Sequence, residues 1–408
     1  MPETLRTYLR YTSWPIIAAA AILVGWGLLA ISASEQADPT IGGYALKQAE
    51  FALVAAAAFV LATLLPYQAL GRYAYLIFAV MLALLVTVLC LPPIRYSHRW
   101  IVLGGLQVQI SEISKLSYII MLAWYLRYRK NYRRLTGLAV PFVLTFLPLG
   151  LVLVEPDLGT SLLFLPTLYF MLFMAGAKLR HLLGIMAVAT AVVLFPAPQA
   201  IEPGLATPAM AYGELTLAGR RYAFSAASLA LMEPHQRARV DGWLHQEQLK
   251  ASDKGYQLAQ SKMVIGAGRL GGYGDWNEGE TYFQMLPEDH TDFIFSVIAG
   301  RWGFLGCVGV LLLYGVIFLL GAEIAVITYD PFGRLLAVGV LALLFSQIVI
   351  NIGMTMGLMP VTGMTLPLMS YGGSSLVMNA AALGMLVNVG QRMPVLLAPR
   401  PFEHRQED

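Results

Sequence analysis

Long apolar runs, separated by shorter polar segments, dominate this chain of 408 residues. A helix needs about 20 largely apolar residues to cross the hydrocarbon of a membrane. Ten runs reach this length or come near it, at approximately residues 14–33, 48–67, 72–91, 112–127, 136–154, 158–176, 181–199, 294–321, 333–353 and 366–390. The pattern predicts an all-α integral membrane protein of about ten transmembrane helices, which form a single polytopic domain over residues 1–408.

The composition supports a membrane protein over a soluble one. Hydrophobic residues make up 58% of the chain and charged residues 12%, whereas soluble domains carry about 25% charged residues. The formal net charge of +3 gives no indication of a nucleic-acid partner. The two cysteines, Cys90 and Cys307, both lie in apolar runs, so the sequence supports neither a disulfide framework nor a zinc site.

Lysine and arginine in the connecting segments predict the orientation of the chain. Short loops rich in these residues stay in the cytoplasm. The strongest such signal is RYRKNYRR at residues 127–134, and both ends of the chain fall on the same side. We therefore expect both termini in the cytoplasm. The long polar segment at residues 200–290 then forms an extracytoplasmic loop between the seventh and eighth spans, and loops of that length are usually functional or disordered.

Polar residues at the start of the fourth run need an explanation at membrane depth. The stretch HRWIVLGGLQVQISEISKL carries Arg99, Trp100, Glu112 and Lys115. Glu112 and Lys115 are three residues apart, so they share a helix face and can neutralise each other. Alternatively, Arg99 and Lys115 could donate hydrogen bonds to an anionic head group. The sequence leaves both interpretations open.

Two further polar stretches also allow a structural and a functional interpretation. In EPDLGTSL, Asp157 could cap the helix that follows it. In GYQLAQSKMVIGAGRLGGYG, Gln257, Gln260 and Lys262 precede a glycine-rich segment. Such a segment can cradle phosphates with its backbone N–H groups, but glycines as simple turn residues are an equal alternative.

The last apolar run is interrupted by helix-breaking residues. From Asn351 the chain reads NIGMTMGLMPVTGMTLPLMSYGGSSL, with two prolines and several glycines. Broken helices are tolerated at membrane depth where they line a cavity or are buried in protein. We therefore expect an outward-facing cavity lined by Thr362, Ser370, Tyr371 and the glycines.

An acidic residue stands at the head of the eighth run. In LPEDHTDFIFSVIAG, Thr291 or Asp292 could cap the helix and stabilise its N-terminal dipole. The competing hypothesis is catalytic, because an acid at the boundary between water and membrane can accept a proton from a hydroxyl presented there.

Together these stretches resemble the SEDS family of polytopic membrane proteins, which includes RodA and FtsW. The similar segments are RWIVLGGLQVQISEISKL, EPDLGTSL, GYQLAQSKMVIGAG, LPEDHTDFIF and NIGMTMGLMPVTGMTLPLMSYGGSSL, in family order between residues 99 and 379. The resemblance implies a ten-span protein of the bacterial cytoplasmic membrane. It also implies a peptidoglycan glycosyltransferase that polymerises lipid II and works with a class B penicillin-binding protein.

The resemblance assigns roles to particular residues. Asp292 would be the essential catalytic carboxylate, and Trp100 a functionally important residue. Arg99, Lys115, Arg239 and Lys262 are candidates for contacts to the lipid-linked pyrophosphate, assigned partly from their chemistry. The remaining candidates for substrate binding are Glu112, Gln257, Gln260, Glu288, His290, Thr291, Ser370, Tyr371, Gly372, Gly373 and Ser374. A divalent cation, Mg²⁺ or Mn²⁺, could assist the pyrophosphate, although the sequence shows no convincing cluster of metal ligands.

The chain departs from the family pattern in several places. After TDFIF the family usually has A-E-E-L-G, whereas this chain has Gly300 and Arg301 in place of the two acids. The family also writes Q-P-S-E where this chain has QISE at residues 109–112, and residues 205–232 match no family motif. NIGM followed by MPVTG resembles RodA more than FtsW. Four hypotheses thus remain: a RodA-like polymerase for cell elongation, an FtsW-like septal polymerase, a lipid II flippase or transporter, and a non-catalytic scaffold for a penicillin-binding protein.

Overall fold

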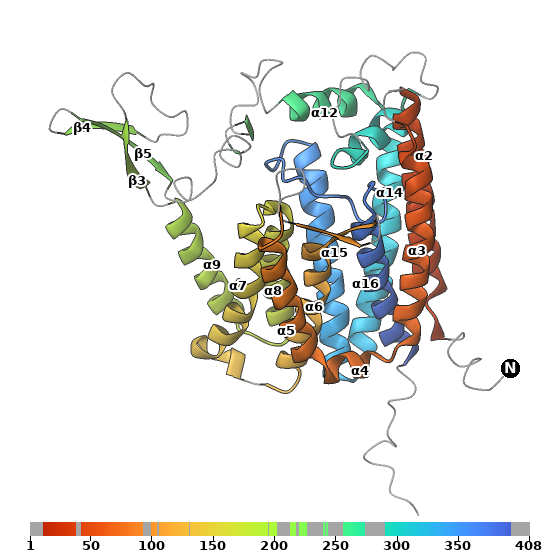
Figure 1. The fold of residues 1–408 in the computed structure, drawn as a ribbon, viewed down its shortest axis with the longest axis horizontal. Helices are drawn as coiled ribbons and strands as arrows, with labels where there is room; N and C mark the ends of the chain where they lie inside the picture. Colours follow the sequence, from red (N-terminus) through yellow and green to blue (C-terminus); the bar gives the residue numbers. More distant parts are fainter. Residues whose placement is uncertain are drawn as a thin grey trace, which may run out of the picture.

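The helices form one bundle in the computed structural model (Figure 1). The structure describes residues 11–37, 42–92, 99–103, 106–129, 131–194, 196–201, 213–217, 220–226, 240, 242–243, 256–273 and 290–392. The α-helices named below are α2 (Trp14–Ala37), α3 (Tyr44–Leu64), α4 (Tyr67–Arg72), α5 (Ala74–Leu89), α6 (Ile110–Leu126), α7 (Ala139–Val154), α8 (Leu158–Met174), α9 (Leu179–Leu194), α12 (Tyr256–Ala267), α14 (Ile294–Ile327), α15 (Pro331–Thr355) and α16 (Gly373–Gln391). Two short 3₁₀ helices, η1 (Asn131–Arg133) and η2 (Leu135–Leu138), precede α7.

The helical membrane fold predicted from the apolar runs is confirmed. Six helices among the described residues are long and apolar enough to cross a membrane, namely Trp14–Gln36, Tyr44–Leu64, Leu135–Val154, Ile294–Ile327, Pro331–Thr355 and Gly373–Gln391. Three shorter apolar helices, Ala74–Leu89, Leu158–Met174 and Leu179–Val192, coincide with other predicted runs. The fourth run forms α6, so every predicted run overlaps a helix. The number of ten membrane crossings stays a prediction.

Some predicted helix boundaries are wrong. The last run was expected to be helical from residue 366, but α16 begins at Gly373. Turns replace the helix before it, in a stretch that includes Pro367 and two glycines. The third run is divided at Tyr73 into α4 and α5. The seventh run ends early, because residues 196–199 belong to a strand.

Two small antiparallel sheets accompany the helices, and the all-α prediction did not include them. Strands β1 (Trp100–Leu103) and β2 (Leu106–Gln109) pair in the register Trp100 with Gln109. The second sheet has the order β3 (Pro196–Ile201), β5 (Arg220–Ala226), β4 (Gly213–Leu217). Figure 1 shows it beyond the end of α9, away from the other helices. It accounts for part of the segment that matched no family motif.

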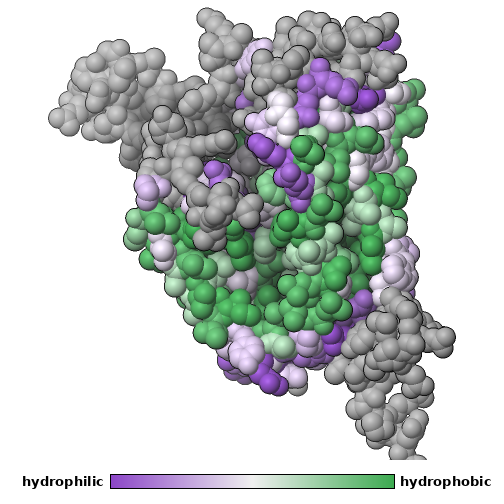
Figure 2. Space-filling view, turned by 45° about the vertical axis from the view of Figure 1, so that its right-hand side comes forward, coloured by the Kyte–Doolittle hydropathy of each residue, from purple (hydrophilic) through white to green (hydrophobic). Residues whose placement is uncertain are grey.

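Burial identifies α15 and α16 as the inner helices of the bundle. In their most apolar windows, 78% of α15 and 72% of α16 are buried inside the protein, against 11% of α3. The outer helices expose apolar side chains, as expected for a surface in contact with lipid. Figure 2 shows an apolar band across one face of the bundle, with hydrophilic residues gathered above and below it.

The bundle has two distinct ends, which are useful for locating the functional residues. Helix α12 lies across one end, and α4 lies at the other (Figure 1). At the α4 end, the amide of Asn388 donates hydrogen bonds to the carbonyls of Ala62 at 3.1 Å and Leu65 at 2.8 Å, which fixes the C-terminus of α3 to α16.

Candidate active site

Asp292 lies in a turn at the α12 end, directly before α14. The residue at the N-cap position is Phe293, whose side chain makes no capping bond, so the alternative that Thr291 or Asp292 occupies the cap position of this helix is wrong. The side chains of Thr291 and Asp292 are partly exposed. The backbone carbonyl of Asp292 accepts a hydrogen bond from Nδ2 of Asn351 at 3.0 Å. Asn351, in α15, thus fixes the backbone that carries the carboxylate.

An aromatic cluster joins this turn to the stretch before α16. The ring of His290 lies 4.6 Å from the ring of Tyr44 and 5.7 Å from that of Tyr371, measured between centroids. The backbone N–H of Tyr371 donates to the carbonyl of His290 at 2.9 Å. His290 is buried, whereas Tyr371 is partly exposed. Two predicted site residues from distant parts of the chain therefore meet here.

Gln48 of α3 holds the glycine- and serine-rich stretch in place. Its amide donates to the carbonyl of Ser370 at 3.0 Å and accepts from the N–H of Gly372 at 3.2 Å. The hydroxyl of Ser370 accepts a hydrogen bond from the N–H of Leu366 at 2.7 Å, which closes the turn. A Cβ at Gly373 would lie 2.8 Å from the ring of Phe51, so glycine is needed where α16 begins.

The β1–β2 hairpin reaches the same stretch through Ser374. The hydroxyl of Ser374 accepts from the N–H of Gln109 at 3.1 Å. The side-chain amide of Gln109 donates to Asp157 Oδ2 at 3.0 Å. Trp100, at the other side of the hairpin, pairs with Gln109 in register and is partly exposed. The hairpin thus places Trp100 and Ser374 in the same region of the molecule.

Asp157 is a structural carboxylate with many partners. It is 5% exposed, and its side chain caps α8 by accepting from the N–H of Thr160 at 3.1 Å, which confirms the capping prediction. The hydroxyls of Thr160 and Ser111 also donate to it, at 2.9 and 2.8 Å. Arg99 lies 3.8 Å away. These donors occupy both carboxylate oxygens.

Arg99 also binds the backbone next to Asp157. Its guanidinium donates to the carbonyls of Glu155 at 3.2 Å and Pro156 at 2.6 Å. Arg99 therefore fixes the turn between α7 and α8, and any contact to a phosphate would add to these internal bonds.

Glu155 is an unusual residue that was not among the predicted site residues. Its side chain is fully buried, and neither carboxylate oxygen has a hydrogen-bond partner among the described residues. Burial, together with the nearby charge of Asp157, raises the pKa of Glu155 to about 8, although the charge of Arg99 acts in the opposite direction. The available sequence signal was an acid immediately after an apolar run, a position where an ionisable group is costly.

Glu112 and Lys115 form a buried ion pair in α6. The ammonium nitrogen of Lys115 lies 2.8 Å from both carboxylate oxygens of Glu112. The two residues are 6% and 3% exposed. The structure therefore supports mutual neutralisation, one of the two interpretations that the sequence left open.

Helix α12 carries the other predicted residues in this region. Ser261 anchors it, with a hydroxyl that donates to the carbonyl of Thr355 at 2.7 Å and bonds to the hydroxyl of Ser296 at 2.6 Å. Gln260 is buried and Gln257 is partly exposed. Lys262 lies on the exposed side of the helix.

The glycine-rich segment after α12 packs against a kink in α14. Gly303 has φ of 65° and ψ of −160°, which only glycine adopts readily. A Cβ at Gly268 would lie 1.9 Å from the carbonyl oxygen of Ala299, and one at Gly272 would lie 2.1 Å from that of Arg301. The N–H groups of Gly272 and Tyr273 are used within the protein. In this segment the glycines therefore serve packing, which favours the structural alternative.

The two positions that depart from the family pattern, Gly300 and Arg301, lie where the segment after α12 packs against α14. The carbonyl of Gly300 accepts from the N–H of Tyr273 at 3.0 Å. The guanidinium of Arg301 lies 5.3 Å from the ring centroid of Trp302. The loss of the two acids therefore changes the charge where α12 and α14 pack together, several turns from Asp292.

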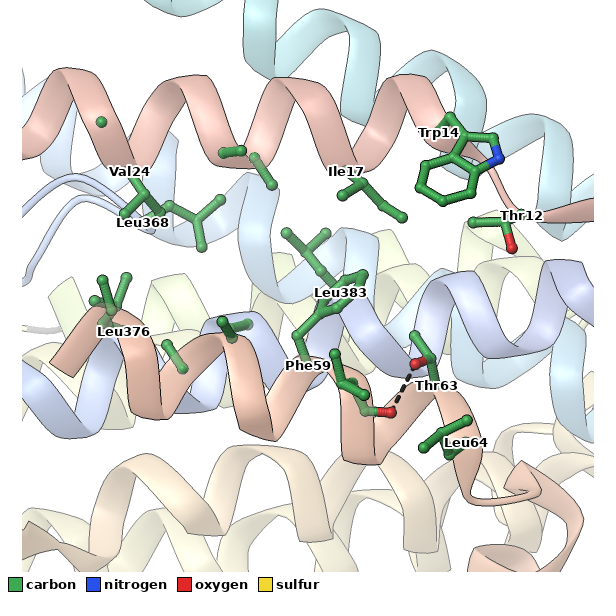
Figure 3. Close-up of a pocket in the computed structure, with 18 of the residues that line it drawn as sticks. Thr12, Trp14, Ile17, Val24, Phe59, Thr63, Leu64, Leu368, Leu376 and Leu383 are labelled. Carbon is green, nitrogen blue, oxygen red and sulfur yellow. Dashed lines mark hydrogen bonds between the residues drawn. The ribbon is translucent and has the colours of Figure 1, made fainter. Parts of the chain in front are cut away.

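Some of the sequence predictions fall elsewhere. Arg239 and Glu288 lie outside the described residues. Thr362 and Ser370 are buried and hydrogen bonded. A hollow of about 890 Å³ between α2, α3 and α16 (Figure 3) includes Leu368 but not Thr362, Ser370 or Tyr371, so it is not the predicted cavity, which stays a prediction. Among the described residues, no three His, Cys, Asp or Glu side chains come close enough to hold a metal ion.

Comparisons with known proteins identify relatives of this chain. The chain is 33% identical over 390 residues to "Peptidoglycan glycosyltransferase RodA" of Treponema pallidum, covering 85% of this chain and 89% of the relative. It is also 33% identical to "Probable peptidoglycan glycosyltransferase FtsW" of Trichlorobacter lovleyi, covering 85% and 84%. A solved structure described as "Structural coordination of polymerization and crosslinking by a peptidoglycan synthase complex" matches with a TM-score of 0.74 and 29% identity, over 94% of this chain and 98% of the other.

A family model confirms the resemblance suggested by the motifs. It carries the names FtsW, RodA and SpoVE, is described as "Cell cycle protein" and matches residues 11–393. This range includes every described predicted site residue from Arg99 to Ser374. The chain belongs to the FtsW/RodA/SpoVE family of cell cycle proteins.

Proposed function

We propose that this protein is a peptidoglycan glycosyltransferase that polymerises lipid II, with Asp292 as its general base. The observation that carries the proposal is the meeting of two motifs at the α12 end of the bundle. Asp292 is partly exposed there, and the turn that holds it is bonded to the stretch before α16 through His290 and Tyr371. Curated relatives of both the RodA and FtsW types are named peptidoglycan glycosyltransferases.

The chemistry requires one base and positive charge near the leaving group. Asp292 would accept the proton from the 4-hydroxyl of one lipid II molecule as its oxygen attacks the anomeric carbon of the growing chain. The bond from that carbon to the pyrophosphate breaks, and undecaprenyl pyrophosphate leaves with the bonding electrons. Cations stabilise the charge that develops on this group. Arg99, Arg239 and Lys262 remain the candidates, and Lys262 is exposed on α12, whereas Lys115 is buried in its pair with Glu112.

The proposed orientation places this chemistry on the outer face of the cytoplasmic membrane. The basic stretch RYRKNYRR, at residues 127–134, connects α6 to η2 and α7. Its described residues lie at the end of the bundle away from α12 (Figure 1). The positive-inside rule assigns that end to the cytoplasm. Both termini would then be cytoplasmic, and the polar segment at residues 200–290 would lie outside.

The proposed partner is a class B penicillin-binding protein that cross-links the new strands. The support is the similarity to a structure whose description joins polymerisation to crosslinking in one complex. A role in elongation is favoured by the sequence NIGM followed by MPVTG, whereas the identity to RodA and FtsW relatives is the same, at 33%. Because no described cluster fits a divalent cation, no residue is assigned to one.

Incubation of the purified protein with labelled lipid II tests the proposal, with and without its cognate penicillin-binding protein. We expect glycan polymer with the wild-type chain. Translocation of lipid II in liposomes without polymer would support the transporter hypothesis. Polymer that forms only when Gly300 and Arg301 are both changed to Glu would identify a degenerate enzyme that serves as a scaffold.

A further inference from the structure

The sheet β3–β5–β4 has two faces of different composition, and its strands β4 and β5 come from the segment that matches no family motif. Successive residues of a strand alternate between the two faces, and residues paired in an antiparallel register share a face. The register pairs Tyr222 with Leu215 of β4 and with Ala200 of β3. Phe224 and Pro198 form the next pair on the same side. We call this side the apolar face of the sheet.

The opposite face of the sheet is mainly polar. Thr216 pairs with Arg221, and Glu214 stands on the same side, two residues before Thr216. Gln199 and Ser225 also belong to this side by alternation along their strands. An antiparallel sheet with one apolar and one polar face is typical of a sheet whose apolar face is covered and whose polar face meets water. The composition therefore indicates that something covers the apolar face.

The helical bundle does not provide this cover. Figure 1 shows the sheet beyond the end of α9, away from the other helices. The part of α9 that leads to the sheet is itself uncovered by the described residues, because each residue from Met186 to Val192 is exposed. This run makes about two turns, so it includes every side of the helix. An apolar helix surface that is bare at membrane depth is in contact with lipid.

The connection between α9 and the sheet is too short to carry the start of the sheet away from this lipid. The apolar sequence of α9 continues to its last residue, Leu194, and β3 begins at Pro196. Two residues span at most about 7 Å. The head-group region of a membrane is about 5–7 Å deep on each side of the hydrocarbon. The first residue of the sheet therefore lies in the head-group region or directly next to it.

We propose that the apolar face of this sheet binds the phospholipid surface at the α12 end of the bundle and anchors the last turns of α9 there. Lipid is the occupant that the arrangement favours, because the sheet begins where the lipid-exposed part of α9 ends and stands away from the other helices (Figure 1). Tyr222, on the apolar face, is a residue type enriched at the membrane–water interface. Arg220 and Arg221 begin β5, and basic residues near a membrane surface attract anionic lipids.

Spin labelling of the full chain in nanodiscs of phosphatidylglycerol and phosphatidylethanolamine tests the proposal. Leu215 and Thr216 are neighbours in β4 that belong to opposite faces, so Leu215→Cys and Thr216→Cys form a matched pair. Both are made in a chain with Cys90→Ser and Cys307→Ala, which removes the native thiols. Oxygen dissolves in lipid whereas a nickel chelate stays in water, so the ratio of their collision rates with the label measures lipid contact. We expect this ratio to be several-fold higher at position 215 than at position 216.

Two other results would overturn the proposal. Equal ratios at positions 215 and 216 would mean that the two faces share one environment. If the penicillin-binding protein, added afterwards, then shields the label at 215 from both reagents, that partner covers the face in place of lipid. Shielding from both reagents in the protein alone would mean that protein covers the face, with magnetic broadening between labels if the cover is a second copy of this chain.

A second pair of variants guards against a change of register in the edge strand. Phe224→Cys and Ser225→Cys repeat the comparison in the central strand β5, and the ratio should again be higher on the apolar face, at position 224. The absence of a difference in both pairs would contradict the proposal. The readout is lipid contact, so it is independent of the reaction proposed at Asp292.

Discussion

Asp157 and Asp292 occupy similar places in the sequence but very different places in the structure. Each stands directly before an apolar run that becomes a membrane helix. Asp157 is 5% exposed and accepts hydrogen bonds from Thr160, Ser111 and Gln109. Asp292 is partly exposed, and Phe293 takes the N-cap position between it and α14.

The comparison shows that an acid at the start of a membrane helix does not by itself indicate a site. A carboxylate whose oxygens are all engaged by donors of its own protein has few acceptor positions left for a substrate. Asp157 fits that description and stabilises the fold. Asp292 combines a fixed backbone with a partly exposed side chain, which agrees with its proposed role as a general base.

The largest expected effect is on catalysis, at Asp292. Asp292→Asn should lower the rate of lipid II polymerisation by roughly 10²–10⁴, the usual contribution of a general base. The unfolding temperature should change little, because the bond from Asn351 to the backbone carbonyl of residue 292 is kept in this variant. Polymerisation assays and thermal unfolding in the same detergent check both parts. A retained rate would remove Asp292 from the mechanism.

The buried pair in α6 should show the largest effect on stability. Lys115→Met leaves Glu112 buried without its cation, which should lower the free energy of unfolding by about 3–5 kcal/mol. Addition of Glu112→Gln to the same chain should recover most of the loss. Lys178→Met, at an exposed lysine, is the control and should change stability by less than about 0.5 kcal/mol. If Lys115→Met lowers the free energy of unfolding no more than Lys178→Met does, the pair does not stabilise the fold.

Asp157 should stabilise the fold in two ways, by capping α8 and by accepting hydrogen bonds from Ser111 and Gln109. Asp157→Ala should cost about 2–4 kcal/mol, since it removes a helix cap and leaves the buried hydroxyl of Ser111 without its acceptor. Asp330 caps α15 through the N–H groups of Phe332 and Gly333. Asp330→Ala should therefore cost only about 1 kcal/mol. Chemical denaturation of both variants measures the difference, and equal losses would mean that the network around Asp157 adds nothing.

A further effect on stability depends on pH and concerns Glu155. Burial raises the pKa of Glu155 from 4.5 to about 8, so the unfolded chain releases this proton at lower pH than the folded chain does. The free energy of unfolding should therefore fall as pH rises between these two values, by at most ~1.4 kcal/mol per pH unit. Glu155→Gln should lose this decline and be the more stable form at pH 9. Unfolding temperatures across the range check it, and parallel curves for the two proteins would contradict it.

The sequence predicted the helices well because a membrane imposes one requirement on every span. A run of apolar residues without an internal break has no alternative to a helix in hydrocarbon. The predictions were wrong where tertiary contacts decide the local structure. Gly373, where α16 begins, packs against Phe51 of α3, and Gly303, where α14 is kinked, packs against the segment around Leu270.

The residues of the candidate site could be predicted from the sequence, but the contacts between them could not. The motifs identified Asp292, His290 and the stretch from Ser370 to Ser374. Nothing in the sequence links Gln48 to Ser370 across 322 positions. Glu155 was not predicted, because the lack of hydrogen bonds to its carboxylate follows from the packing of the turn around it. Its neighbour Asp157, in contrast, shows a recognisable capping pattern.

The most direct test of this account is one polymerisation assay on two variants, Asp157→Asn and Asp292→Asn. The polymer formed from labelled lipid II is measured per folded molecule, at a temperature below the unfolding transition of both. The account predicts that Asp157→Asn retains most of the wild-type rate and that Asp292→Asn retains almost none. Equal rates, or a larger loss in Asp157→Asn, would contradict the division between a structural and a catalytic aspartate.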